Sequence, residues 1–245
     1  MYKFAIAFMT LFLAGCCCDP SYVPSYRRSS KILTYHLLEY CTYMVRESEE
    51  QAYREAGVEN IWAVDDELID KAYFYIAEHA PEDIIVVADD DIEDFRYLLS
   101  DVEPLGCDKE TITAEIERIG QMLFDLHLGL AFIPPNCIPY NYTQEFSFKG
   151  VPGAVKWFNR NVFKAKLDEK VSENFDIDMV LQELLVNRVC LMPKYFYDKG
   201  LIDVNEGGNS DRVRQTQLAS LTNMQAKWGK YFSYDSTKNK PRIEV

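Results

Sequence analysis

Five acidic side chains follow a short apolar run and are the residues of this chain best suited to chemistry. The run covers residues 84–88, and the acids are Asp89, Asp90, Asp91, Glu93 and Asp94. Carboxylates at the carboxyl end of a buried strand are where open α/β sheets place metal-dependent chemistry. The alternative is an acidic, solvated turn that begins a helix, with its carboxylates favoured by the helix dipole. Charge runs are more often solvated, so the sequence predicts no catalytic, cofactor-binding or metal-binding residue.

The spacing of Asp89, Asp90 and Asp91 resembles the first motif of haloacid-dehalogenase-type phosphatases, and residues 151–155 also resemble a segment of those enzymes. The resemblance implies that the first and third acids act as nucleophile and acid in a metal-dependent hydrolase. The chain departs from the family pattern at Glu93, where threonine or valine is usual. It also has no later strand with serine or threonine before Asn-Arg, and no Gly-Asp pair for a second metal carboxylate.

Other catalytic signatures are absent from the sequence. There is no GxSxG elbow, no phosphate loop, no HExxH motif and no CxxC pair, so common hydrolase, nucleotide and zinc motifs are missing. His36, His79 and His127 each lie among apolar or aromatic neighbours, where structural roles are more common than catalytic ones. His36 and Glu39 could share a metal, but one such pair is weak support. We therefore expect no cofactor.

The beginning of the chain has the pattern of a secretory signal. Lys3 precedes an apolar run from Phe4 to Ala14, which is too short to span a bilayer of about 30 Å. Its end, Leu13-Ala14-Gly15-Cys16, resembles the lipobox of bacterial lipoproteins. The resemblance implies cleavage after the glycine, lipid attachment at Cys16, and an outer-membrane location if the source is Gram-negative. The alternatives are an ordinary cleaved signal and a buried core helix.

Composition indicates a folded, acidic protein. The 245 residues are 48% hydrophobic and carry a formal net charge of −13. Residues 17–130 hold 26 acids and 9 bases, whereas residues 131–245 hold 13 acids and 16 bases. Phosphates would be repelled by the acidic part, so nucleic acid is not an expected partner. Of the seven cysteines, Cys41 and Cys190 lie on apolar helical faces and are expected to be buried thiols, and the pairing of the others stays open.

Periodicity predicts a mainly α protein, a multi-helix bundle-like domain with at most a few short strands. Helices are expected at 31–57, 65–81, 92–99, 108–130, 154–165, 177–193 and 210–228, with a strand at 84–88 and a terminal hairpin in 231–245. The expected organisation is a signal peptide at 1–15, a lipidated tether at 16–30, an acidic helical region at 31–130, a proline-rich packed connector at 131–153, and a mildly basic helical region at 154–245 that forms one domain with 31–130.

The sequence thus predicts a lipid-anchored cell-envelope lipoprotein that binds or scaffolds a protein partner in the envelope, with the membrane reached through its N-terminal lipid. One alternative is a metal-dependent, phosphatase-like hydrolase that uses Asp89 and Asp91. Another is an immunity or exclusion lipoprotein that masks a toxin or receptor with an acidic face in residues 47–117. The oligomeric state stays open.

Overall fold

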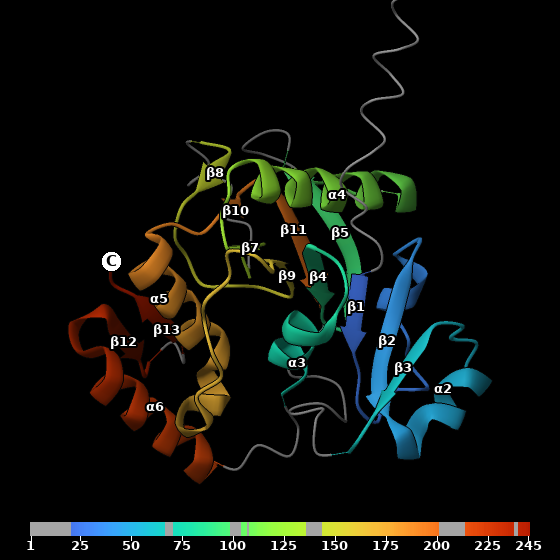
Figure 1. Ribbon diagram of the computed structural model, residues 1–245, viewed down its shortest axis with the longest axis horizontal. Helices are drawn as coiled ribbons and strands as arrows, with labels where there is room; N and C mark the ends of the chain where they lie inside the picture. The colour runs from blue at the N-terminus through green and yellow to red at the C-terminus, as the bar shows by residue number, and fades with distance from the viewer. Residues whose placement is uncertain are drawn as a thin grey trace, which may run out of the picture.

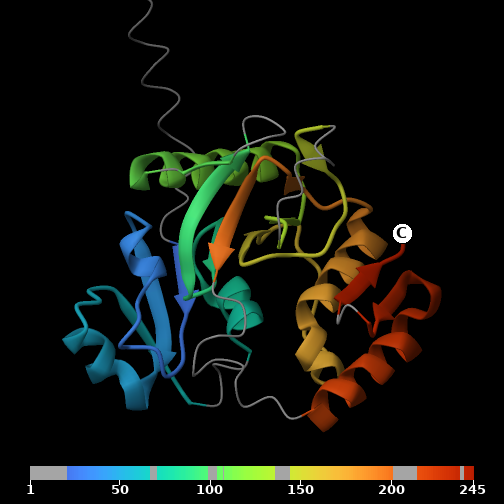
Figure 2. The same ribbon diagram turned by 180° about the vertical axis from the view of Figure 1, so that it is seen from behind.

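The chain forms a six-stranded mixed sheet with helices on both faces, as seen in the computed structural model (Figures 1 and 2). The structure describes residues 21–66, 71–98, 104–106, 108–135, 144–200, 214–237 and 240–245. The prediction of a mainly α bundle is therefore wrong, because the core of the molecule is an α/β sheet.

The central sheet has the order β3-β2-β1-β4-β9-β7. Its parallel part comprises β1 (Ser21–Pro24), β2 (Cys41–Arg46), β3 (Ile61–Val64) and β4 (Ile84–Ala88). β9 (Val155–Asn159) runs antiparallel to β4, and β7 (Leu130–Phe132) runs antiparallel to β9. The four parallel strands consequently end at one edge of the sheet, called here the carboxyl edge. They begin at the opposite edge, called the amino edge.

Smaller strand pairs lie around this sheet. β5 (Ile92–Leu98) pairs on its two sides with β6 (Pro104–Gly106) and β11 (Phe196–Gly200). β8 (Phe146–Ser147) pairs with β10 (Met192–Pro193), and β12 (Phe232–Asp235) with β13 (Lys240–Ile243). The C-terminal hairpin predicted within 231–245 is confirmed.

Two apolar layers sandwich the sheet. α4 (Lys109–Asp125) packs on one face, and α3 (Ala72–His79) and α5 (Phe175–Asn187) pack on the other. α2 (Glu50–Glu55) lies beside β3, and α6 (Arg214–Trp228) packs with α5 and β12. The described residues also include short 3-10 helices: η1 (Thr34–His36), η2 (Glu47–Glu49), η5 (Glu169–Asn174) and η7 (Gly229–Tyr231).

The two strongest sequence patterns correspond to real elements. All five residues of β4 are buried, as expected for a β-branched run in the middle of a sheet. Asp108 caps the start of α4, because its side chain accepts a hydrogen bond from the Thr111 amide at 2.8 Å. The buried stripe of α4, Ile112, Ile116, Ile119 and Leu123, follows the predicted helical spacing. The helix predicted at 108–130 is confirmed, although it ends earlier.

Several predicted helices are in fact strands, and the predictions are wrong because the apolar residues of these strands are spaced as in a helix. Residues 41–46, inside the helix predicted at 31–57, form β2, and residues 92–98 form β5 where a helix was expected. Residues 155–159 form β9, with every residue buried. β2 and β9 are covered on both faces, and such a strand does not alternate between apolar and polar positions, so its period is not visible in the sequence.

The predicted tether at 16–30 is also wrong over its second half. Residues 21–24 form β1 in the middle of the sheet, paired with β2 on one side and β4 on the other. Tyr22 and Val23 are buried. The strand is only four residues long and ends at a proline, so no local pattern reveals it. Cys16 and residues 17–20 lie outside the described residues.

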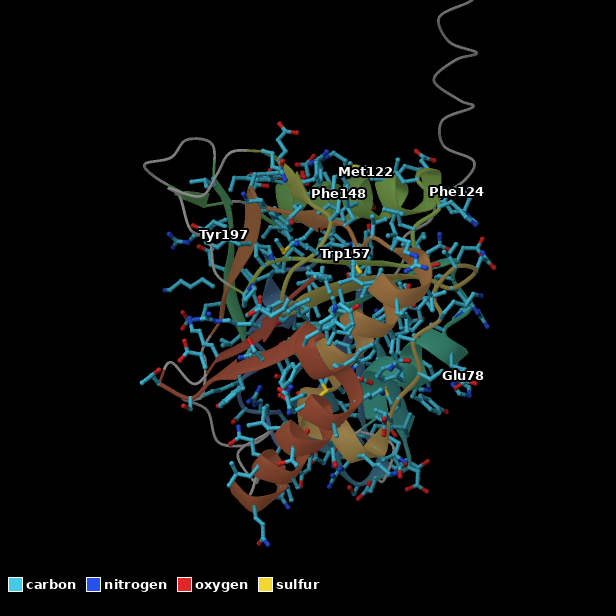
Figure 3. All side chains as sticks on the ribbon, turned by 90° about the vertical axis from the view of Figure 1, so that its left-hand side faces the viewer. Glu78, Met122, Phe124, Phe148, Trp157 and Tyr197 are labelled. Atoms are coloured by element: carbon cyan, nitrogen blue, oxygen red, sulfur yellow. The ribbon has the colours of Figure 1, made fainter. Side chains whose placement is uncertain are left out.

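The core makes a stability prediction. Trp157 of β9 is fully buried below α4 (Figure 3), and its indole N–H donates to the carbonyl of Ile116 at 3.0 Å. Replacing Trp157 by alanine should lower the free energy of unfolding by about 3–5 kcal/mol, because it leaves a cavity and removes the indole hydrogen bond. The matched change at exposed Leu218 should cost less than about 1 kcal/mol. Urea unfolding followed by circular dichroism measures both, and equal losses would contradict this packing.

Candidate functional site

The carboxyl ends of β1 and β4 lie side by side at a switch point of the sheet. The chain leaves β1 toward β2 on one side, whereas β4 pairs with β1 on the other. Open α/β sheets bind ligands in the crevice outside such a point. Asp89, Asp90 and Asp91 follow β4 here, and Ser25 to Arg28 follow β1. The interpretation of 84–88 as a buried strand followed by carboxylates is confirmed.

Asp90 joins the two strand ends. It is 5% exposed and accepts hydrogen bonds from the Ser25 hydroxyl and from Nη1 of Arg28. The Tyr53 hydroxyl lies 2.7 Å from Ser25 Oγ and accepts from the Arg28 amide at 3.1 Å. Since the serine proton points to the carboxylate, Tyr53 donates to Ser25. Burial raises the pKa of Asp90, and the contacts from Arg28 and Ser25 offset part of that rise.

Asp89 is held from three directions. The Tyr73 hydroxyl of α3 donates to its side chain. Its amide donates to the carbonyl of Ala154 at 3.0 Å, and its carbonyl accepts from Thr34 Oγ1 at 2.7 Å. Tyr73 in turn packs against Phe175, the first residue of α5, with ring centroids 5.3 Å apart. The two segments that resemble the phosphatases, 89–91 and 151–155, are therefore adjacent.

Asp91 and Asp198 have carboxyl groups whose pKa values lie above the usual value for aspartate. Burial, followed by the charges of Asp89 and Asp90, raises the pKa of Asp91 to about 6. Burial and the charge of Asp89 raise the pKa of Asp198 to about 7, against a lowering effect of Lys156. Asp198 lies on β11, and its Oδ1 is buried without a hydrogen-bond partner. These carboxylates repel one another and leave one acceptor unsatisfied.

Positive charge reaches the site from two sides. Nη1 of Arg28 lies 3.1 Å from Oδ2 of Asp91, and its pKa rises because the two aspartates outweigh its own burial. Lys156 of β9 is 4% exposed, and its ammonium donates to the carbonyl of Gly153 at 2.8 Å. The same ammonium lies 4.5 Å from the centre of the Tyr73 ring. The site is thus an acidic centre with a buried lysine and a half-buried arginine at its margin.

Two members of the predicted acidic cluster lie elsewhere. Glu93 and Asp94 belong to β5, where they form ion pairs with Lys199 at 3.2 Å and with Arg96 at 3.0 Å. These pairs are partly exposed, so they contribute little to stability. The structure therefore divides the cluster into three residues at the carboxyl edge and two on the adjoining strand. Sequence reasoning missed Ser25, Arg28, Tyr73, Lys156 and Asp198, which no motif marks and which only the fold brings together.

The other candidate residues do not join this site. His36, His79 and His127 are all exposed, and His79 stacks on Tyr75 at 4.1 Å between ring centroids. Cys41 and Cys190 are buried free thiols, and burial raises the pKa of Cys41 to about 11. The lipobox residues Leu13, Ala14, Gly15 and Cys16 lie outside the described residues. Across the described ranges, no helix has the length and apolar character needed to cross a membrane.

The carboxyl edge is suited to a divalent cation whose coordination is completed by oxygens of a bound ligand. Within the residues that the structure describes, no three His, Cys, Asp or Glu side chains form a ready metal cage. Mg²⁺ and similar ions are often held by one or two carboxylates together with substrate phosphates. The unpartnered Oδ1 of Asp198, near the charge of Asp89, is an acceptor that such a cation would satisfy. One or two carboxylates from the group Asp89, Asp91 and Asp198, together with oxygens of the ligand, would therefore hold it.

Comparison of the chain with protein-family models and with curated protein sequences gives no match. The geometry of the carboxyl edge is therefore the basis for a function.

The raised pKa values predict how stability depends on pH. In the folded protein the pKa is about 6 for Asp91 and about 7 for Asp198, whereas the pKa of an unperturbed aspartate is 3.8. Their contribution to stability is present below about pH 4 and is lost as the pH rises through these values. The melting temperature of the metal-free protein should fall between about pH 5 and pH 8, by roughly 2–4 °C for each kcal/mol lost.

Scanning calorimetry of the parent and of the Asp198→Asn protein measures this effect. The substitution should flatten the fall, because it removes one titrating carboxyl, whereas Glu93→Gln on β5 should leave it unchanged. Added Mn²⁺ should raise the melting temperature more at pH 8 than at pH 5. A pH dependence that is the same in all three proteins would refute the assignment of these carboxyls.

Proposed function

We propose that the protein is a metal-dependent transferase that binds a nucleoside diphosphate at the carboxyl edge of β1 and β4, with a nucleotide sugar as the donor. The observation that carries the proposal is a set of carboxylates at the switch point of the sheet. Asp89 and Asp91 follow β4, and Asp198, which has one unpartnered oxygen, interacts electrostatically with Asp89. A divalent cation there would neutralise the charge of the diphosphate as it leaves.

Electrostatics favours a ligand that brings or shares a cation. An isolated phosphate would be repelled by several carboxylates at the end of β4, in a chain of net charge −13. A cation between the carboxylates and a diphosphate reverses this repulsion, and oxygen ligands from both sides suit Mg²⁺ or Mn²⁺. This is why we propose a diphosphate and not a monoanionic ligand.

An aromatic ring and two guanidinium groups lie together beside this site, at the end of β2. The guanidinium of Arg46 lies 3.8 Å from the centre of the Tyr26 ring, and that of Arg27 lies 4.8 Å from the same centre. Tyr26 follows β1 directly after Ser25, so the stack adjoins the buried contact of Ser25 with Asp90. Stacked aromatic and guanidinium groups are suitable for a nucleoside. This arrangement supports a nucleotide over a simple phosphate ester.

The side chains at this site are better suited to transfer of a sugar from a nucleotide sugar than to hydrolysis through a phosphoenzyme. A phosphoenzyme needs a free carboxylate as nucleophile, but Tyr73 donates to Asp89, and Asp90 is engaged by Ser25 and Arg28. Departure of a diphosphate from a sugar needs no protein nucleophile in a direct displacement. It requires stabilisation of the leaving group and a positioned acceptor. The alternative is the phosphatase mechanism that the resemblance implies, and the test must distinguish it from the transferase.

Release of nucleoside diphosphate tests the proposal. The purified protein should release it from at least one member of a panel of nucleotide sugars in the presence of Mn²⁺, and chelation should abolish the release. Asp91→Asn should lower the rate at least about 100-fold, since it weakens the hold on the cation. Asp94→Asn, whose carboxylate pairs with Arg96 on β5, is the matched control and should retain activity.

Calorimetric titration with nucleoside diphosphates should show binding that requires the metal. Hydrolysis of a generic phosphate ester with loss of activity in Asp89→Asn would favour the phosphatase instead. Absence of metal-dependent nucleotide binding across the panel would reject the transferase.

We also propose that the protein is held at the bacterial cell envelope by lipid on Cys16, on the strength of the Leu13-Ala14-Gly15-Cys16 motif and the preceding apolar run. One acyl chain binds membranes only marginally, so lasting attachment requires two or more. A binding or immunity role through residues 47–117, with an envelope protein as partner, stays a prediction.

Mass spectrometry of the mature protein tests the anchor. The expected N-terminal residue is a diacylated Cys16, and Cys16→Ala should release the protein from membranes whereas Cys17→Ala should not. An uncleaved leader or an unmodified thiol at Cys16 would reject the anchor without bearing on nucleotide binding.

A further inference from the structure

Most of the exposed large apolar side chains lie at one end of the molecule. The described residues include nine such side chains, and three of them, Leu218, Tyr231 and Val245, lie in the last part of the chain, from α6 onward. The other six belong to segments at the amino edge of the sheet and are called here the amino-end surface. They are Tyr40, Phe124, Leu126, Phe148, Leu185 and Val186, each between 43% and 61% exposed.

Hydrogen bonds fix the position of each segment. The carbonyl of Tyr40 accepts from the amide of Ser21, the first residue of β1. Phe124 and Leu126 lie at the end of α4, just before β7, and the following Gly129 accepts from the amide of Asn159, the last residue of β9. β7 begins, and antiparallel β9 ends, at the amino edge.

The remaining three residues lie beside the same loop. The carbonyl of Phe148 accepts from the amide of Cys190, and the next residue, Leu191, donates to the carbonyl of Leu130. Leu185 and Val186 are in the last turn of α5, next to Asn187, whose side chain approaches Gly129. Figure 3 shows Phe124 and Phe148 toward the same end of the molecule, with Met122 of α4.

The preceding chain indicates what covers this surface. β1 begins at the amino edge, so the 20 residues before Ser21 join the fold at the same end as the six apolar side chains. Cys16 is five residues before Ser21, a separation that cannot exceed about 17 Å in extended chain. Lipid on Cys16 would bring the amino edge to the bilayer and direct the carboxyl edge away from it.

Local charge is mixed at this surface. Glu39 and Asp125 lie beside Tyr40 and Phe124 in the chain, and Lys149 and Arg188 lie beside Phe148 and the end of α5. Neither sign dominates, so attraction to anionic headgroups is not the driving force. Exposed Tyr, Phe and Leu side chains suit the boundary between headgroups and acyl chains, where apolar burial supplies the binding.

We infer that the amino-end surface docks on a lipid bilayer, with its apolar side chains in the headgroup boundary and the Asp89 site at the far end of the sheet. The inference deepens the proposed anchor by giving the protein one orientation on the membrane. The anchored enzyme then acts on ligands that approach from the aqueous side.

Quenching of tryptophan by brominated lipid tests the orientation. The full chain, purified from membranes of a bacterial host, is reconstituted in phosphatidylcholine vesicles that contain brominated phosphatidylcholine. Leu126→Trp places a reporter in the amino-end surface, and Leu218→Trp is the matched control, because the parent leucines are 53% and 56% exposed. The added fluorescence in Leu126→Trp should be quenched at least about twofold more than that in Leu218→Trp.

Equal quenching in the two variants, or failure of the full chain to float with vesicles, would overturn the docking. A dimer that buries this surface would leave the Leu126→Trp reporter unquenched and would overturn it as well. The acylation state of Cys16, read from the same samples by mass, reports on the anchor separately. Selective quenching without acylation keeps the docking and rejects the anchor, and acylation without selective quenching does the reverse.

Discussion

The contact of buried Asp90 with Ser25 and Arg28 is the constraint on which the rest of the site depends. It ties the turn after β1 to the turn after β4, so the two central strand ends cannot separate. Removal of one partner from a buried, hydrogen-bonded ion pair is costly, because a charge is left without compensation. Tyr53 extends this contact to α2 by contacting both Ser25 and the Arg28 amide.

Once Asp90 is fixed, the positions of its neighbours follow. Asp89 and Asp91 lie on either side of it in the chain, and Tyr73 and Arg28 hold them from different elements. The result is a set of carboxylates whose mutual repulsion is only partly relieved by protein cations. A divalent ion shared with a diphosphate supplies the missing positive charge, which is the physical basis of the proposed function.

The sequence predicted the parts of this arrangement that depend on local pattern. The apolar run at 84–88 and the isoleucine stripe of α4 were sufficient to identify a buried strand and an amphipathic helix. The acidic residues after the strand were recognised as the best candidates for chemistry, although they were judged more typical of a solvated turn. The same pattern assigned Glu93 and Asp94 to one cluster with the others, since it could not show that β5 begins at Ile92.

The parts that depend on tertiary structure could not be predicted. β1 is four residues long and β2 is buried on both faces, so neither alternates in polarity, and the sequence pattern wrongly predicts a helical bundle. Asp198 lies more than a hundred residues after Asp89, and only the pairing of β11 with β5 brings it near. No spacing rule connects such residues without knowledge of the topology.

The most direct measurement of the central claim is a crystal structure of the protein with Mn²⁺ and a nucleoside diphosphate, analysed for anomalous scattering. The account predicts one manganese peak at the carboxyl edge, bound by oxygens of the Asp89, Asp91 and Asp198 group and by the diphosphate, with the nucleoside beside Tyr26. Manganese and nucleotide bound at another place, or a nucleotide at this edge with no manganese, would contradict it.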